Sequence, residues 1–278
     1  MSSDNSPTRT GHLYLVGVGP GDPELMTYKA VRILTEAKIW AVPTARENGV
    51  SSAQQIAGQM IADKGRKILS LCFPMKKVFL GQETDDQLLQ AWRKSADEVI
   101  RHLDRGEDVA FPTLGDATLY STAFYLLAMI QEQRPDVPVT VVPGITAMAA
   151  CAASQSSPLA LGDDVLAVVP AAFEDDRLRQ ILTTLDSVVL MKVHKRIDAL
   201  IDILEELELA EHAVLIERSG MEGERVYTDI REARGRKLHY FSTMVIRKKK
   251  VQVSNGTHAI ALRSEEHTSE LQSRLHLV

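Results

Sequence analysis

Short runs of apolar and β-branched residues alternate along the chain with longer segments in which apolar residues recur every three or four positions. Short runs of this kind are typical of buried strands, and the longer period is typical of amphipathic helices. The clearest helix is predicted over residues 85–105, where Leu88 and Trp92 fall on one face with charged residues between them. Strands are predicted at 12–18, 39–42 (ended by Pro43), 67–72, 108–112 and 137–142, and further helices at 23–37, 51–63, 118–132 and 145–153. This alternation predicts an α/β fold.

The periodicity lapses between residues 154 and 164, where a Ser-Gln-Ser-Ser-Pro stretch and a Gly-Asp-Asp stretch predict an inter-domain crossing. Further strands are predicted at 165–169, 187–191, 213–216 and 240–247, with helices at 175–185 and 195–209. We therefore expect two α/β domains, an N-terminal domain over 11–157 and a smaller C-terminal domain over 158–250. Residues 251–278 are expected to form a poorly ordered or non-native tail, because their largely polar sequence has little periodicity.

Charge and composition narrow the classes of partner. The formal net charge of −5 provides no overall positive field, so we expect no nucleic-acid partner. No apolar run reaches the ~18 residues of a membrane span, and the polar first residues lack the apolar core of a signal peptide. Cys72 and Cys151 belong to no CxxC pair, which favours buried thiols in a reducing compartment, and the histidines show no spacing typical of metal ligands. These features predict a soluble cytoplasmic protein without a metal site.

The first candidate site is the glycine-rich turn from Gly17 to Asp22, between a predicted strand and a predicted helix. Its glycines allow positive φ and close approach by a neighbouring backbone or a ligand. The turn does not match the GxGxxG pattern of dinucleotide-binding folds, because Pro20 and Pro23 remove two amide donors and Asp22 places a negative charge where a pyrophosphate would bind. No GxxxxGK[ST] phosphate loop occurs in the chain. A tight structural turn without a ligand remains the alternative.

Two further turns follow predicted strands. The first contains Gly115 and Asp116, an acid that can accept hydrogen bonds from a ligand but that, taken alone, is more typical of a helix cap. The second runs from Pro143 to Thr146, whose hydroxyl can instead bond to the local backbone. All three turns lie at the carboxyl ends of predicted strands, where ligands collect in open α/β sheets.

In this order and spacing, the three turns resemble those of the tetrapyrrole (class III) methyltransferases. Within that family the chain is most similar to the precorrin-2 and cobalt-factor II C20-methyltransferases of cobalamin biosynthesis. The resemblance covers roughly Leu13 to Arg247, and beside the turns it is carried by Phe73-Pro74-Met75, Phe111 to Thr122, Met191-Lys192-Val193, Glu217 to Val226 and Tyr240 to Thr243. The chain departs from the family pattern at Ala117, where proline is common, and at Lys76 to Phe79.

The resemblance implies two α/β domains with the cofactor cleft between them, S-adenosylmethionine as co-substrate, a tetrapyrrole substrate and a homodimer. By motif, it implies these cofactor-site residues: Pro20, Leu114, Gly115, Asp116, Leu119, Thr146, Ala147 and Met191. Substrate contacts are expected from Asp22, Tyr120, Lys192 and Lys195, although the two lysines are equally typical of a solvated helix start. No catalytic residue is assigned, because alignment of methyl donor and acceptor can by itself supply on the order of 7–11 kcal/mol.

Two alternatives stay open at this point. One is another regiospecific methyltransferase of the same superfamily, acting at a different macrocycle carbon or on a different acceptor. The other is a nucleotide-binding module that uses the glycine-rich turn without catalysis. The sequence does not decide whether the macrocycle contains cobalt.

Overall fold

The computed structural model describes residues 9–46, 49–63, 65–74, 84–170, 175–249 and 251. The chain divides into two compact units, the first formed by Met1–Pro158, Ile216–Val226 and Lys237–Thr243 and the second by Leu159–Leu215, Tyr227–Arg236 and Met244–Val278. The predicted domain boundaries stay predictions, and the predicted tail over 251–278 lies outside the described residues except for Val251. No helix in the described part of the chain is both long enough and apolar enough to cross a membrane.

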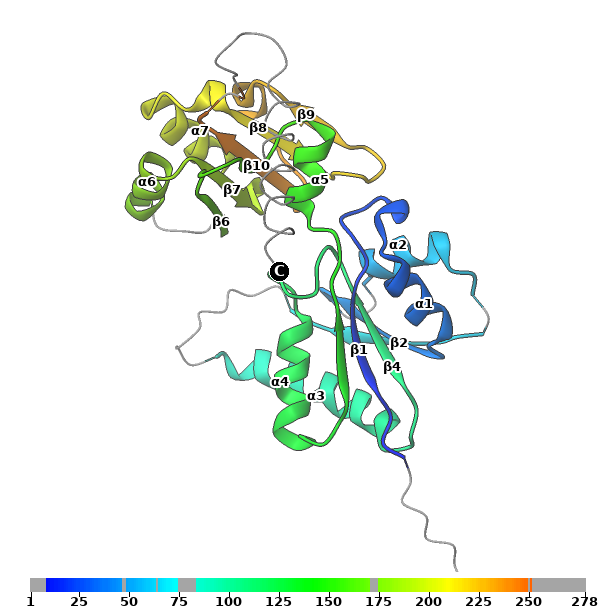
Figure 1. The fold of residues 1–278 in the computed structure, drawn as a ribbon. Helices are drawn as coiled ribbons and strands as arrows, with labels where there is room; N and C mark the ends of the chain where they lie inside the picture. The colour runs from blue at the N-terminus through cyan, green and yellow to red at the C-terminus, as the bar shows by residue number, and fades with distance from the viewer. Residues whose placement is uncertain are drawn as a thin grey trace, which may run out of the picture. The chain divides into compact units, whose positions relative to one another are not determined.

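The first sheet has five strands in the order β3-β2-β4-β1-β5 (Figure 1). They are β1 (Leu13–Gly17), β2 (Ile39–Thr44), β3 (Lys67–Cys72), β4 (Val109–Thr113) and β5 (Val139–Val142). The recorded pairs are all parallel, with Leu13 opposite both Val109 and Val139. Because the strands run in one direction, the turns that follow β1, β4 and β5 emerge at the same edge.

Helices cover both faces of this sheet. They are α1 (Tyr28–Glu36), α2 (Ser52–Met60), α3 (Asp86–Leu103), α4 (Ala123–Gln133) and α5 (Ala147–Ser154). Alternation along β1 divides the core: Val16 and Val18 pack with α1 and α2, whereas Leu13 and Leu15 pack with α3 and α4. Figure 1 shows α1 and α2 on one side of β1 and β4, and α3 and α4 on the other.

The second sheet also has five strands, in the order β6-β7-β10-β8-β9. Its strands are β6 (Leu166–Pro170), β7 (Ser187–Met191), β8 (Ala213–Glu217), β9 (Arg225–Tyr227) and β10 (Ser242–Arg247), and its helices are α6 (Asp175–Thr184) and α7 (Ile197–Glu206). Leu178 and Leu182 of α6 and Leu200 and Leu204 of α7 are fully buried, so each helix keeps an apolar face. The two sheets with their helices confirm the predicted α/β class.

The single helix predicted over 23–37 is wrong, because the chain is extended at Met26 and Thr27. A short 3-10 helix over Pro23–Leu25 precedes this break, and Asp22 accepts a hydrogen bond from the Glu24 backbone N–H at 2.8 Å. Thr27 then begins α1 by accepting a bond from the Ala30 N–H at 3.2 Å. Two caps therefore divide a segment whose apolar periodicity is continuous.

Other predicted boundaries also shift. The helix predicted over 118–132 begins only at Ala123, because the preceding residues form a turn in which Tyr120 has a φ of 52°. Pro43 does not end β2, which continues to Thr44; its recorded register with β4 covers only Ile39 and Trp40. The helix predicted over 195–209 is present as α7, but it is shorter and follows a 3-10 turn over Val193–Lys195. Strand β9 was not predicted.

A buried carboxylate organises the end of β10 in the second unit. The Asp164 side chain is 4% exposed and lies 2.7 Å from Arg247 Nη2 and 3.1 Å from Lys249 Nζ. Hydrogen bonds to the carboxylate, first from the Leu161 N–H and then from Arg247 and Lys249, outweigh the opposing effect of burial and lower the pKa of Asp164 to about 2.

We expect Asp164→Asn to lower the free energy of unfolding at neutral pH by about 2 kcal/mol, because charge-assisted hydrogen bonds are lost. Since the folded-state pKa lies below the unfolded value near ~4, the stabilisation is complete above that value and is lost as the pH falls toward 2. Urea unfolding at a series of pH values measures both effects. The exposed neighbour Asp163→Asn is the control, and equal pH dependence in Asp164→Asn and the unsubstituted chain would contradict the assignment.

Candidate functional site

The three predicted turns are in contact at the carboxyl edge of the first sheet. Gly19 and Gly115 form an antiparallel bridge, in which the Gly19 N–H donates to the Gly115 oxygen at 3.1 Å and the Gly115 N–H donates back at 2.7 Å. The bridge joins the turn after β1 to the turn after β4. Residues almost a hundred positions apart are thereby held as one surface.

Glycine is required in these turns by the approach of backbone to backbone. A Cβ atom on Gly144 would lie 2.2 Å from the Gly115 oxygen, and one on Gly17 would lie 2.7 Å from the same oxygen. Gly115 has a φ of 69°, and a Cβ built there would have only the Ile145 oxygen, at 3.9 Å, within 4 Å. Gly115 itself is buried, but no neighbouring backbone crowds the place that a side chain would take, unlike at Gly17 and Gly144.

The Asp116 carboxylate links the second turn to the third. Its Oδ2 accepts a hydrogen bond from the Gly144 N–H at 2.7 Å, and its Oδ1 accepts bonds from the Thr118 N–H at 2.7 Å and from the Thr118 hydroxyl. Burial raises the pKa of Asp116, but these bonds from Thr118 and Gly144 together lower it below its usual value. The group is therefore ionised at neutral pH and fixes the positions of both turns.

The remaining residues predicted in the first unit belong to these turns or follow them. Pro20 is buried in the first turn, and Leu114 is half-buried against the core around Val16 and Val18. Thr146 caps α5 by accepting a bond from the Ala149 N–H at 3.3 Å, which is the local role left open by the sequence. Half-buried Leu119, exposed Tyr120, half-buried Ala147 and half-buried Asp22 complete the set.

Three predicted residues belong to the second unit. Met191 is the last residue of β7 and is half-buried, and Lys192 follows it with a left-handed backbone at φ 61°. Lys195 is exposed at the end of the following 3-10 turn. Their roles in cofactor or substrate binding stay predictions.

Sequence reasoning assigned no role to the loop between β8 and β9, which contacts the first turn. A Cβ atom on Gly21 would lie 2.6 Å from the Ser219 oxygen and 2.9 Å from the Gly220 carbonyl carbon. The Met221 side chain packs against the core formed by Val16, Val18 and their neighbours. The closely spaced glycines of this loop are its sequence signal, but they do not identify the partner turn.

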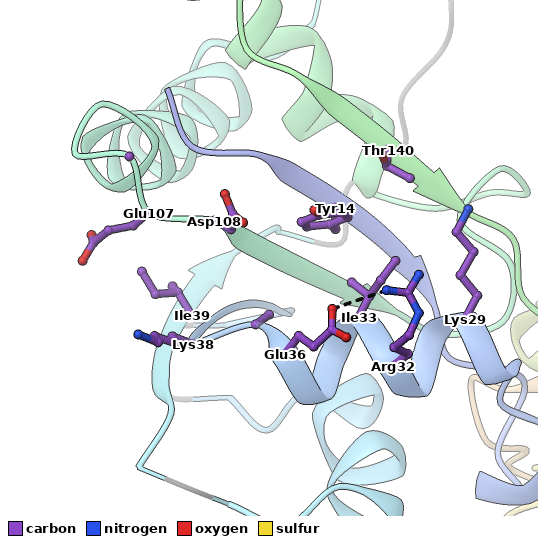
Figure 2. Close-up of a pocket in the computed structure, with 12 residues that line it drawn as sticks. Tyr14, Lys29, Arg32, Ile33, Glu36, Lys38, Ile39, Glu107, Asp108 and Thr140 are labelled. Atoms are coloured by element: carbon purple, nitrogen blue, oxygen red, sulfur yellow. Dashed lines mark hydrogen bonds and ion pairs between the residues drawn. The ribbon is translucent and has the colours of Figure 1, made fainter. Parts of the chain in front are cut away.

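A cavity of about 560 Å³ lies at another part of the first unit (Figure 2). It is lined by Tyr14 of β1, by residues of α1 such as Lys29 and Arg32, and by Asp108 just before β4. Tyr14 lies near the amino-terminal end of β1 and Asp108 lies just before β4, and the lining includes none of the residues of the three turns. Among the described residues, no group of three or more His, Cys, Asp or Glu side chains is arranged to hold a metal ion.

The family described as Tetrapyrrole (Corrin/Porphyrin) Methylases matches residues 12–234. The chain belongs to this family. The match spans all three turns and the β8–β9 loop, and it confirms the resemblance drawn from the sequence.

Curated relatives carry more specific names. The cobalt-precorrin-2 C(20)-methyltransferase of Salmonella typhimurium is 33% identical over 241 residues, which cover 86% of this chain and 97% of the relative. The precorrin-2 C(20)-methyltransferase of a Sinorhizobium species is 31% identical over 241 residues, covering 85% and 95%. The uroporphyrin-III C-methyl transferase of Thermus thermophilus, crystallised with S-adenyl homocysteine, has a TM-score of 0.60 at 21% identity, covering 86% of this chain and 98% of that structure. The solved structure shows that the fold is shared.

Proposed function

We propose that this tetrapyrrole methylase transfers a methyl group from S-adenosylmethionine to C20 of precorrin-2 or its cobalt-containing counterpart in corrin-ring synthesis. The observation that carries the proposal is similarity to two C20-methyltransferases over nearly their whole length, 97% and 95%. The interlocked turns support it, because hydrogen bonds hold the backbone around Gly115 and Asp116 in a rigid frame. The chain acts as an enzyme with S-adenosylmethionine as its co-substrate.

The proposed cofactor site is formed by the predicted residues of the three turns, with Met191 of the second unit as a further contributor. Gly115 offers backbone without a side chain, and Leu114 and Leu119 offer partly buried apolar surface to the adenosine and methionine portions. Asp116 acts through its bonds to Gly144 and Thr118, which hold the backbone in place. Its contribution is therefore mainly one of positioning.

The electron-rich C20 carbon attacks the methyl group of the sulfonium, S-adenosylhomocysteine leaves, and the C20 proton is then lost to water or a nearby carboxylate. Because positive charge is dispersed as the methyl leaves sulfur, the displacement does not need a strong base. The contribution of the protein is alignment, for which a rigid backbone frame is suited, and this can supply several kcal/mol, on the order of 7–11. No residue of this chain is assigned as a general base.

The proposed substrate is a small anionic macrocycle. Asp22 and Tyr120 are proposed to border its site in the first unit, and Lys192 and Lys195 are proposed to meet its carboxylates. The two lysines are proposed for this role because they are positively charged and directly follow β7. A cytoplasmic location, a homodimer and the absence of a nucleic-acid partner complete the proposal.

Calorimetric titration can test whether S-adenosylmethionine is the methyl donor without requiring catalytic turnover. We expect S-adenosylhomocysteine to bind and NAD and ATP to bind at least ~100-fold more weakly, because Pro20, Pro23 and Asp22 disfavour a pyrophosphate in the first turn. Tighter binding of NAD or ATP would contradict the methyltransferase assignment and favour a nucleotide-binding module.

A further inference from the structure

Arg218 occupies a constrained backbone position directly after β8. Its φ is 59°, in the left-handed region that non-glycine residues seldom adopt. The Arg218 N–H donates to the Phe241 oxygen at 2.7 Å, and the Arg218 oxygen accepts from the Met221 N–H at 2.9 Å. Hydrogen bonds on both sides of the residue therefore hold this conformation, and with it the direction in which the side chain leaves the backbone.

The Arg218 side chain has an unsatisfied donor. Its Nε is buried and has no hydrogen-bond partner among the described residues, and no ion pair joins Arg218 to an acidic group in that part of the chain. A Cβ on Gly223 would lie 3.6 Å from Nη1, so the guanidinium rests beside the loop backbone. A buried guanidinium N–H without a partner is costly, which favours the binding of an anion.

Two of the three acidic residues nearest to Arg218 in sequence are already engaged, and the third, Glu222, is exposed. Glu217 is 1% exposed and accepts bonds from Arg225 Nη2 at 3.2 Å and from the His239 N–H at 2.6 Å. Glu224 accepts a bond from the Gly220 N–H at 2.6 Å. These pairings leave Arg218 as the uncompensated cation of the β8–β9 loop, because the charge of Glu217 is already met by Arg225.

The loop that carries Arg218 is fixed against the first turn of the proposed site. A Cβ on Gly220 would lie 2.8 Å from the Asp22 nitrogen, and Met221 packs against the core beneath that turn. The backbones of the β8–β9 loop and the first turn are packed so closely that the loop cannot shift along the turn. Arg218 is therefore held within the first unit at a set distance from the turn that contains Asp22.

We infer that Arg218 binds a peripheral carboxylate of the tetrapyrrole and thereby sets the orientation of the macrocycle. This inference rests on the proposed function. A planar guanidinium presents paired donors that match a carboxylate, and an ion pair there compensates the charge of Arg218. The Glu217–Arg225 pair positions Arg218 by holding the start of the loop.

The test compares Arg218→Gln and Arg218→Lys with the unsubstituted enzyme. We expect Arg218→Gln to raise the KM for the tetrapyrrole by about tenfold, because a charge-assisted bond is lost, while the Kd for S-adenosylhomocysteine stays within about twofold. We expect Arg218→Lys to raise the KM by less, since lysine keeps the positive charge but lacks the paired planar donors of the guanidinium. Arg32→Gln, in an exposed pair with Glu36 on α1, is the matched control and leaves both constants unchanged.

A second measurement separates this inference from the proposed function. Fluorescence titration with uroporphyrin III and with its methyl ester reports carboxylate binding without methyl transfer. Arg218-dependent binding of the acid but not the ester supports the inference even where the enzyme fails to methylate a C20 substrate. An unchanged KM and unchanged uroporphyrin affinity in folded Arg218→Gln, or an equal loss of S-adenosylhomocysteine binding, would overturn it.

Discussion

Replacing Gly144 by alanine is expected to lower the free energy of unfolding by about 3 kcal/mol and to abolish methyl transfer. The added Cβ would lie 2.2 Å from the Gly115 oxygen and 2.9 Å from the Gly17 carbonyl carbon. Both neighbours are backbone atoms in turns that are themselves bonded to the sheet, so neither can rotate away. The third turn must therefore move, and its movement breaks the bond between the Gly144 N–H and Asp116.

Gly58→Ala is the matched control for this substitution. Gly58 lies within α2, and nothing lies within 4 Å of the position its Cβ would take. Alanine is expected to stabilise the protein there by about 0.5–1 kcal/mol, because glycine is unfavourable in a helix. Chemical unfolding and an activity assay check both variants. A Gly144→Ala protein with unchanged stability and activity would show that the turns are not rigidly interlocked.

Asp116→Ala is expected to weaken S-adenosylhomocysteine binding by about tenfold, with a smaller loss of stability. Removal of the carboxylate leaves the Gly144 N–H and the Thr118 N–H without their acceptor, and the second and third turns are no longer tied together. The effect on the ligand is therefore transmitted through the backbone. Calorimetric titration of each variant measures it.

Asp116→Asn separates the charge from the shape of the side chain. The amide keeps one oxygen acceptor but presents an NH₂ group to the other donor, so an intermediate loss of affinity is expected. Asp63→Ala provides the control, since exposed Asp63 likewise accepts two backbone bonds, from Gly65 and Arg66 at 3.1 Å, in an unrelated turn. Unchanged affinity in Asp116→Ala would remove Asp116 from the site.

Most helices and strands could be predicted, because apolar residues recur along the sequence with the spacing typical of each. The strand over Ser187–Met191 and the strand over Lys67–Cys72 match their predicted bounds. The break at Met26 and Thr27 could not be predicted in the same way, since it depends on a competing cap at Thr27 within a continuous apolar pattern. Local side-chain bonds, and not periodicity, decide such boundaries.

The meeting of the three candidate turns at one edge of the sheet could be predicted, but the hydrogen bonds that join them could not. Turns after parallel strands collect at one edge, which follows from strand direction alone. The hydrogen bond from the Gly144 N–H to Asp116 joins residues 28 positions apart in the sequence. No local sequence pattern predicts such a bond. Gly21 and the Ser219–Gly220 backbone are in contact although they lie far apart in the sequence. Apart from the glycines themselves, nothing in the sequence predicts this contact.

The interlocked turns explain how a methyl transfer can proceed without an assigned base. Gly19 and Gly115 are bonded to each other, Asp116 binds the third turn, and the β8–β9 loop packs against the first. Each link restricts backbone movement in the turns at which the proposed function aligns its two reactants. Rigidity is thus the property on which the proposed function chiefly depends.

The most direct test of the account is the product formed from defined acceptors. The purified protein is incubated with S-adenosylmethionine and, in parallel, with metal-free precorrin-2, cobalt-factor II and uroporphyrinogen III, and the products are analysed by mass spectrometry and by NMR of isotope-labelled methyl groups. The account predicts a single added methyl at C20 of precorrin-2 or cobalt-factor II, and the preferred acceptor identifies the metal state of the substrate. Methylation of uroporphyrinogen III alone, a methyl at another carbon, or no methylation of either dimethylated acceptor would contradict it.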